Sequence, residues 1–204
     1  MNRKFQEAGM MQKRSSTIAV LTLVVGLVTI GLIIVFSSTP LFNPSAPVSS
    51  VDQAKALAEQ YASSQASGLR VKEIMEFSNQ YYAIIQENSG INAFEILVDK
   101  ATGRVFLEPG PSMMWNTKYG HMRSRNPAAT MPVSSEQAQR NAQQWLDNNF
   151  PNAKAEEPET FYGYYTLDFA RNNQTIGMLS VNGYSGEVWY HTWHGQFIRM
   201  IEYD

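Results

Sequence analysis

The chain has 204 residues, of which 44% are hydrophobic, enough to bury one large core or two small ones. Its formal net charge of -2 and its pI near 5.9 provide no basic surface for nucleic acid. The lack of cysteine excludes disulfides, zinc-thiolate sites, iron–sulfur clusters and cysteine nucleophiles.

The N-terminal quarter of the chain predicts a membrane anchor followed by a tether. Residues 1–16 carry four basic side chains and one acidic one, which places them in the cytoplasm. Residues 17–36 contain no charge over 20 positions, and a helix of that length, about 30 Å, spans a bilayer. A cleaved signal peptide is the alternative, but its apolar region is usually only about 7–15 residues long. Residues 37–49 are rich in proline and serine and predict an extended tether.

A first folded unit is predicted at residues 50–109. Ser50-Val51-Asp52-Gln53 has the pattern of a capping box, which begins a helix. Apolar residues follow at the spacing of one helical face: Ala54, Leu57, Ala58 and Tyr61. The period then changes to that of strands, which we expect at residues 73–77, 81–87, 93–98 and 104–108.

The same order of elements restarts at residues 133–204. Ser134-Ser135-Glu136-Gln137 is a second capping box, and apolar residues follow it at helical spacing: Ala138, Ala142, Trp145, Leu146 and Phe150. Strands are expected at residues 160–170, 176–181, 187–192 and 196–203. Residues 110–132 form a methionine-rich bridge between the two units.

One hairpin motif occurs in both units, at Val98–Phe106 and at Val181–Trp189. In each copy Asp or Asn opens a turn and glycine supplies the positive φ that the turn requires; the turn residues are Asp99, Gly103, Asn182 and Gly186. Gly103 and Gly186 are 83 positions apart, as are the pairs Tyr81-Tyr82 and Tyr164-Tyr165. The constant spacing predicts a tandem duplication of one helix plus an antiparallel sheet, which is an α+β fold.

With its capped helix and the motif V-[DN]-x-x-[ST]-G-x-V-[FW], each unit resembles the PepSY domain family. The resemblance covers residues 50–107 and 134–190. It implies a non-catalytic module on the outer side of prokaryotic membranes. Such modules occur in metallopeptidase propeptides, where they are associated with inhibition, and in membrane-anchored proteins thought to act on neighbouring proteins. We expect no peptidase domain behind the repeats, so direct autoinhibition is not expected.

The bridge contains a candidate metal site. Met113, Met114, His121 and Met122 place three thioethers and an imidazole within ten residues, and such soft ligands suit Cu(I). The alternative is an apolar clasp that joins the two units, formed by Met114, Trp115, Tyr119 and Met122. A partner-binding surface is the third interpretation of this segment.

His191-Thr192-Trp193-His194 has the pattern H-x-x-H. On a strand, residues three apart point to opposite faces, so both imidazoles would meet one metal only if the chain turns there. Together with His121 they make up all three histidines of the chain. The alternative is that the aromatic strand ends around them form core and sheet surface.

We found no G-x-S-x-G, P-loop, G-x-G-x-x-G or H-E-x-x-H motif, so we expect no enzyme, no catalytic residues and no cofactor apart from the copper alternative. The predicted function is that of a single-pass, extracytoplasmic binding or regulatory module of a prokaryotic cell membrane. The chain is expected to bind another extracytoplasmic or membrane protein, either as the regulator of a peptidase or as an accessory subunit of a membrane complex. It is also expected to contact the lipid bilayer through residues 17–36.

Overall fold

The computed structural model describes residues 46–121 and 130–203. The predicted cytoplasmic segment, membrane helix and most of the tether lie outside these residues. No helix within the described residues is both long enough and apolar enough to cross a membrane.

Two helices of 15 residues each, α2 (Val51–Gln65) and α4 (Ser135–Asn149), begin at the two capping serines. The hydroxyl of Ser50 accepts a hydrogen bond from Gln53 N, and that of Ser134 accepts one from Gln137 N, both at 3.2 Å. Each helix buries small or aliphatic residues four positions apart: Ala54, Ala58 and Ala62 in α2, and Ala138, Ala142 and Leu146 in α4. A short helix, α3 (Pro111–Met114), lies in the bridge.

The strands form two antiparallel sheets, in agreement with the predicted α+β class. The first sheet has five strands in the order β10 (Phe197–Glu202), β1 (Leu69–Phe77), β2 (Gln80–Glu87), β3 (Asn92–Asp99) and β4 (Val105–Leu107). The second sheet has the order β5 (Lys154–Ala155), β7 (Tyr164–Arg171), β8 (Gln174–Asn182) and β9 (Val188–Tyr190), and β6 (Glu159–Thr160) also pairs with β7.

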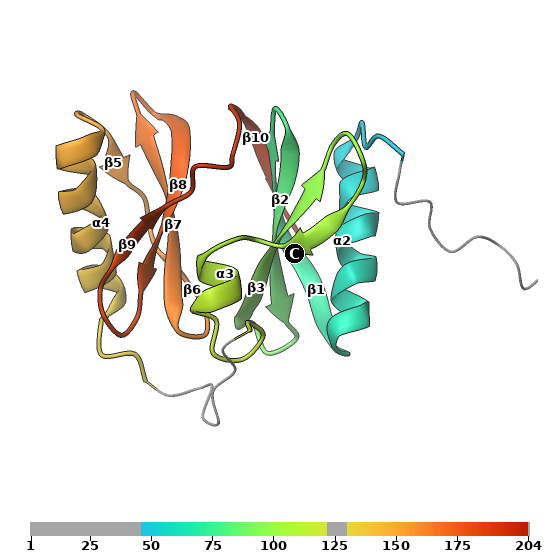
Figure 1. The fold of residues 1–204 in the computed structure, drawn as a ribbon, viewed down its shortest axis with the longest axis horizontal. Helices are drawn as coiled ribbons and strands as arrows, with labels where there is room; N and C mark the ends of the chain where they lie inside the picture. Colours follow the sequence, from blue (N-terminus) through green and yellow to red (C-terminus); the bar gives the residue numbers. More distant parts are fainter. Residues whose placement is uncertain (1–45, 122–129, 204) are drawn as a thin grey trace, which may run out of the picture. The chain divides into compact units, whose positions relative to one another are not determined.

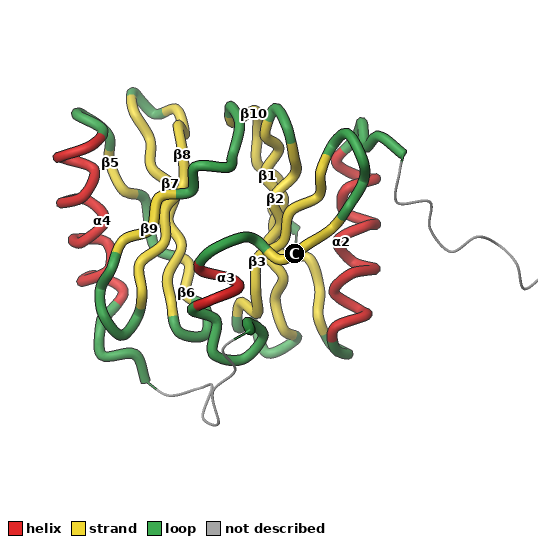
Figure 2. The backbone as a smooth tube through the Cα atoms, in the orientation of Figure 1, coloured by secondary structure: helices red, strands yellow, loops and turns green. Residues whose placement is uncertain are grey.

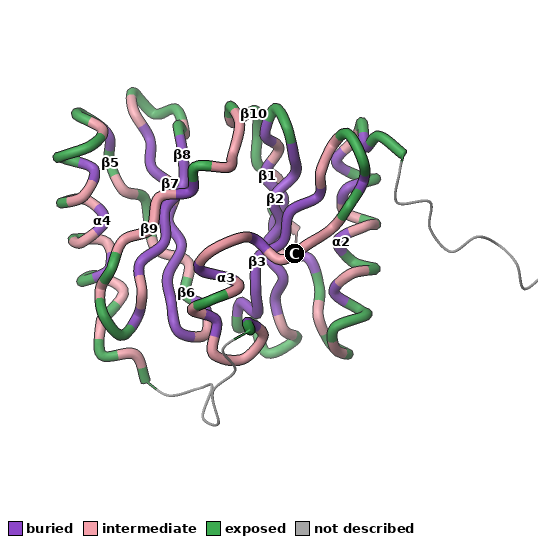
Figure 3. Tube along the Cα trace, viewed as in Figure 1, coloured by how far each residue is buried: buried purple, intermediate pink, exposed green. Residues whose placement is uncertain are grey.

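The described residues are arranged in four layers, with a helix on the outer face of each sheet and the inner faces of the sheets toward each other (Figures 1 and 2). One core lies between α2 and the first sheet, a second between α4 and the second sheet, and a third between the two sheets. The central strands are accordingly buried along most of their length, whereas each helix exposes its outer side (Figure 3).

The last strand crosses from the second unit to the first sheet. Residues 196–203 were expected within the second unit, but β10 pairs with β1, with Ile201 opposite Ile74 and Met200 opposite Met75. Ile201 thereby packs against the core beneath α2. The crossover covers the edge of β1 that would otherwise be unpaired, so the two repeats of the sequence are not two independent sheets.

Both hairpin turns use the same contacts. Asp99 Oδ1 accepts a hydrogen bond from Thr102 N at 2.8 Å, and Asn182 Oδ1 accepts one from Ser185 N at 3.0 Å. Gly103 and Gly186 have φ angles of 68° and 74°, in the left-handed region.

The tyrosine pairs of the two copies align differently from the sequence prediction. Tyr81 lies opposite Val98 in the first sheet, and Tyr165 lies opposite Val181 in the second. Tyr81 therefore corresponds to Tyr165, at a spacing of 84 rather than 83. A shift of one residue reverses the face of a strand on which a side chain lies. Tyr82 and Tyr164 therefore both point between the sheets.

Candidate functional site

Ionisable residues interrupt the apolar pattern on the inner faces of both sheets. In β3, Phe94 and Ile96 face α2, so Glu95 between them points toward the second sheet. By the same alternation Glu73 of β1 and Asp168 of β7 point inward. Burying a carboxyl group is costly unless it has a partner. The inner face, which carries three such groups, is therefore the candidate functional surface.

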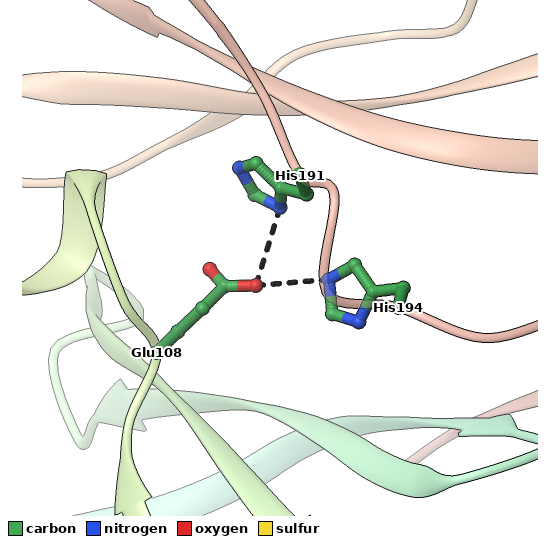
Figure 4. A group of neighbouring side chains, drawn as sticks. All are labelled: Glu108, His191 and His194. Carbon is green, nitrogen blue, oxygen red and sulfur yellow. Dashed lines mark hydrogen bonds and ion pairs between the residues drawn. The ribbon is translucent and has the colours of Figure 1, made fainter.

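Glu108, His191 and His194 form a buried cluster between the sheets (Figure 4). Glu108 Oε1 lies 3.2 Å from His191 Nδ1 and 3.0 Å from His194 Nε2. The side chains of Glu108 and His191 are 0% exposed and that of His194 is 2% exposed. One ligand atom from each residue lies within 4.8 Å of the other two, a set that could hold a metal ion.

Two members of this cluster, Glu108 and His191, occupy equivalent positions in the two repeats. Glu108 directly follows β4, and its N–H donates to Glu95 O at 3.0 Å. His191 directly follows β9, and its N–H donates to Met178 O at 3.1 Å. The two residues occupy equivalent positions, 83 residues apart. His194 comes from the crossover that leads to β10 and stacks on Phe77, with ring centroids 4.4 Å apart.

Further hydrogen bonds orient both imidazoles. His191 Nε2 lies 3.0 Å from Ser180 Oγ, which in turn lies 2.8 Å from Thr166 Oγ1. Gln80 Nε2 donates to His194 Nδ1 at 2.8 Å, which leaves the His194 proton on Nε2, facing Glu108.

Burial and the neighbouring imidazoles shift the pKa of Glu108 in opposite directions. Burial by itself raises the pKa of Glu108, but the two neighbouring imidazoles outweigh it and lower that pKa to about 2. Burial also lowers the pKa of His194, because it disfavours the imidazolium. Both directions fit an ionised Glu108 that accepts a hydrogen bond from a neutral His194.

The pKa of Glu95 shifts in the opposite direction from that of Glu108. Tyr82 and Tyr164 each donate their phenolic hydroxyl to its carboxyl group at 2.7 Å, one tyrosine from each sheet. Burial, and then the charge of Glu108, raise the pKa of Glu95 well above its usual range. Glu95 thus holds its proton more tightly than an ordinary carboxyl group, whereas Glu108 holds its proton less tightly.

Ser180, His191 and Glu108 are arranged in the order that activates serine nucleophiles in hydrolases. Ser180, however, is 0% exposed and its Oγ also contacts Thr166, so it orients His191 within the core. Two imidazoles and a carboxylate are instead a ligand set that suits a divalent transition metal.

An acidic cleft of about 460 Å³ opens between the sheets, beside the inner core. Its lining includes six carboxylates and no Lys, Arg or His: Glu73, Glu156, Glu157, Glu159, Asp168 and Glu202. Apolar side chains form the rest of its wall, among them Met75, Ile84, Met178 and Met200.

Glu73 is the most buried of these carboxylates, at 5% exposure. In the described part of the chain its carboxyl group has neither a hydrogen-bond partner nor a salt bridge; the nearby Lys72 pairs with Glu159 at 2.6 Å. Burial, followed by the charge of Glu159, raises the pKa of Glu73 to about 7, although Lys72 acts to lower it. Burial also raises the pKa of Asp168.

The predicted thioether site shares no described residue with either the buried cluster or the acidic cleft. Met113 is half-buried, Met114 is 53% exposed and His121 is exposed, whereas Met122 is outside the described residues. His121 N donates to Met113 O at 2.8 Å, which holds the two residues close through the backbone. The copper site stays a prediction.

The clasp interpretation applies to other side chains of the bridge. Trp115 contacts Trp189 edge to face at 5.7 Å, and Tyr119 packs on Phe94 at 5.1 Å. Both residues thus join the bridge to the sheets. Met114, expected in the clasp, is exposed instead.

The two imidazoles of the H-x-x-H pattern point to the same candidate metal site, because the chain turns at Thr192-Trp193. The third member of that group is Glu108, and His121 takes no part in it. Sequence reasoning missed Glu108, although its position, 83 residues before His191, was a readable signal.

No family model and no curated protein match the chain. Among solved structures it is similar to the C-terminal domain of YpeB from Bacillus megaterium, with 12% identity and a TM-score of 0.27. The match covers 71% of this chain and 62% of that one, so it spans less than two thirds of the YpeB domain. A similarity this low says nothing about function.

Proposed function

We propose that the two sheets form a non-catalytic module that binds another protein, by holding an extended basic segment of that partner in the acidic cleft. The observation that carries the proposal is the acidic lining of the cleft, which has six carboxyl groups and no basic side chain. Three of the six, Glu156, Glu157 and Glu202, form no salt bridge with the described residues and supply its unpaired charge. Such a surface attracts cationic groups and raises their rate of encounter.

The spacing of the carboxylates favours an extended cation over a single metal ion. Among the described residues, Glu108, His191 and His194 are the group of three such side chains whose ligand atoms converge within 4.8 Å, and none of them lines the cleft. A lysine or arginine side chain can lay its alkyl stem along Met75 and Met178 and direct its charge to the carboxylates.

The edge of the first sheet offers the backbone contacts for such a segment. β10 is the terminal strand of that sheet among the described residues, and its Met200 and Glu202 line the cleft. Ile198 and Met200 are 52% and 43% exposed. A peptide added beside β10 as a further strand would satisfy the free backbone groups and cover both side chains.

The rest of the proposal comes from the sequence. Residues 17–36 would anchor the chain as a single-pass protein of a prokaryotic membrane, with the N-terminus in the cytoplasm and the module outside. The resemblance to PepSY modules supports a regulatory or accessory role, with a peptidase or a membrane complex as the partner. Fold-level analogy of this kind supports a role only by association.

A peptide-binding measurement tests the cleft. The full-length chain, in a mild detergent, is titrated into a labelled peptide of alternating lysine and leucine, and fluorescence anisotropy reports binding. We expect binding that weakens about 10- to 100-fold when Glu156→Gln, Glu157→Gln and Glu202→Gln are combined, since each lost charge contributes roughly 0.5–1 kcal/mol.

The matched control removes three exposed carboxylates outside the cleft, by Glu59→Gln, Asp147→Asn and Glu187→Gln. This variant should bind as the wild type does. Equal weakening in both variants, or equal binding of a peptide with glutamate in place of lysine, would refute the proposal.

Crosslinking in native membranes then identifies the partner. A photoreactive residue in place of Met200 should capture a protein through a basic segment, and the triple cleft variant should lose that capture. The same group at Gln144, on the exposed side of α4, is the control and should capture nothing.

A further inference from the structure

We propose that Glu108, His191 and His194 bind one zinc ion, which joins the two sheets at the crossover. The ligand atoms are one carboxylate oxygen of Glu108, His191 Nδ1 and His194 Nε2. The site uses none of the residues of the acidic cleft or of the predicted thioether site.

Two buried polar atoms of the cluster lack hydrogen-bond partners. Among the described residues three buried side-chain atoms have none, and Glu108 Oε2 and His191 Nδ1 are two of them. The 3.2 Å contact of His191 Nδ1 with Glu108 Oε1 falls outside hydrogen-bond geometry. Leaving such groups unpaired in a core is costly. A cation would satisfy His191 Nδ1, and it would also satisfy Glu108 Oε2 where both carboxylate oxygens bind it.

The spacing of the ligand atoms fits zinc. Zinc bonds of about 2.0–2.2 Å in a tetrahedron set the ligand atoms roughly 3.3 Å apart. The two N–O separations here are 3.2 Å and 3.0 Å, and the two imidazole nitrogens lie within 4.8 Å of each other. Binding would therefore keep the first two distances and bring the nitrogens to about 3.3 Å by rotation of the side chains. Two imidazoles favour zinc over magnesium or calcium, which take oxygen ligands. The second carboxylate oxygen or a water molecule provides the fourth ligand.

Each histidine also has the outer partner that a metal ligand requires. When His191 Nδ1 binds the ion, its Nε2–H donates to Ser180 Oγ, 3.0 Å away. When His194 Nε2 binds the ion, its Nδ1–H faces the amide of Gln80 at 2.8 Å, which accepts the proton through its oxygen after rotation. Both tautomers are thus fixed by residues already in place.

The three ligands come from parts of the chain that only the tertiary structure brings together. Glu108 follows the last strand of the first repeat, His191 ends the second sheet, and His194 lies in the segment that returns to the first sheet. An ion at this point would hold the crossover closed and keep β10 against β1. Thr192 and Gln196 of the ligand loop are exposed, which gives the ion a route from solvent.

Metal binding to the full-length chain tests the proposal. Cobalt(II) replaces zinc and reports its coordination by visible absorption, and competition with a chromophoric chelator gives the zinc affinity and stoichiometry. We expect one zinc per chain, an intense tetrahedral cobalt spectrum, and a rise in melting temperature with zinc. His194→Gln should weaken binding by more than about 100-fold and Ser180→Ala by about 10- to 100-fold, the usual range for outer partners.

The matched control is His121→Gln, which removes an exposed histidine outside the cluster and should leave zinc binding unchanged. Circular dichroism of each variant separates loss of the site from loss of the fold. The proposal is overturned if the folded wild type binds no zinc, or if His121→Gln loses as much affinity as His194→Gln.

Discussion

The two copies of the repeat agree on their outer faces and differ on their inner ones. Under the helices, Ala54 and Ala58 of α2 match Ala138 and Ala142 of α4, all fully buried. Between the sheets, the positions equivalent by hydrogen bonding are Glu95 and Met178, and Glu108 and His191. An apolar inner residue in one copy thus matches a carboxyl group in the other, and an acid matches a histidine.

This difference shows where the duplicated unit diverged in chemistry. The outer faces share one task, the packing of a helix on a sheet, and the same residues serve it twice. The inner faces must fit each other, so unlike side chains in the two copies can pair. The buried cluster and the acidic cleft both lie on these unlike faces.

The largest expected effect comes from making the inner faces alike. Glu95→Met gives the first copy the residue of the second and removes the acceptor of two buried tyrosine hydroxyls. Each unpaired donor costs about 1–3 kcal/mol, so the free energy of unfolding in urea should fall by about 2–6 kcal/mol. Adding Tyr82→Phe and Tyr164→Phe should restore most of it; no recovery would argue against the hydrogen bonds as the cause.

A second substitution removes a difference between the two copies where each helix packs on its sheet. Leu146 of α4 is fully buried, and the corresponding residue of α2 is Ala62. Leu146→Ala should lower the free energy of unfolding by about 2–5 kcal/mol through the cavity that it leaves. The exposed Asn148→Ala serves as the control, and a cost below that of this control would contradict the assigned packing.

The cleft should make stability depend on pH through Glu73. Its pKa of about 7 in the folded chain exceeds the ordinary value of 4.5, so the folded state retains the proton longer than the unfolded state does. Stability should therefore fall as the pH rises from about 4.5 to 7, by about 3 kcal/mol in total.

Glu73→Gln cannot ionise and should remove this dependence. Urea unfolding at pH 8 should show a gain of about 3 kcal/mol over the wild type, with little difference at pH 4. Glu187→Gln in the exposed hairpin turn removes the same charge and should leave the pH profile of the wild type. A gain of equal size at both pH values would show that Glu73 is not the titrating group.

The smallest effect separates the two hairpin turns. A Cβ at Gly103 would meet the backbone oxygen of Ala46 at 2.9 Å, and one at Gly186 would meet the side-chain amide of Asn141 at 2.7 Å. The end of a side chain can move away more easily than a backbone atom, so the clash at Gly103 costs more. Both sites have positive φ, which costs a side chain about 1–3 kcal/mol. Gly103→Ala should therefore lower the melting temperature more than Gly186→Ala does. The reverse order would contradict the contact with Ala46.

Much of the architecture was readable from local patterns, and part of the candidate site was too. The capping serines, the two turns and the alternation around Glu95 depend on residues within a few positions of each other. The pairing of tyrosines was misaligned because a spacing of 83 or 84 is indistinguishable by residue type alone, and only the strand register separates them. Glu108 belongs to no local motif, and its sequence signal is the repeat spacing of 83 residues to His191.

Local patterns in the sequence were sufficient to predict the repeated order of elements, the α+β class and the turns, because neighbouring residues set backbone geometry and periodicity. Three features depend on the folded chain instead: β10 joins the first sheet, Glu108 lies beside His191, and six carboxyl groups line one cleft. These are contacts between distant segments, and they depend on which faces of the two sheets bury each other. Local periodicity assigns a residue to a face but does not say what that face will meet.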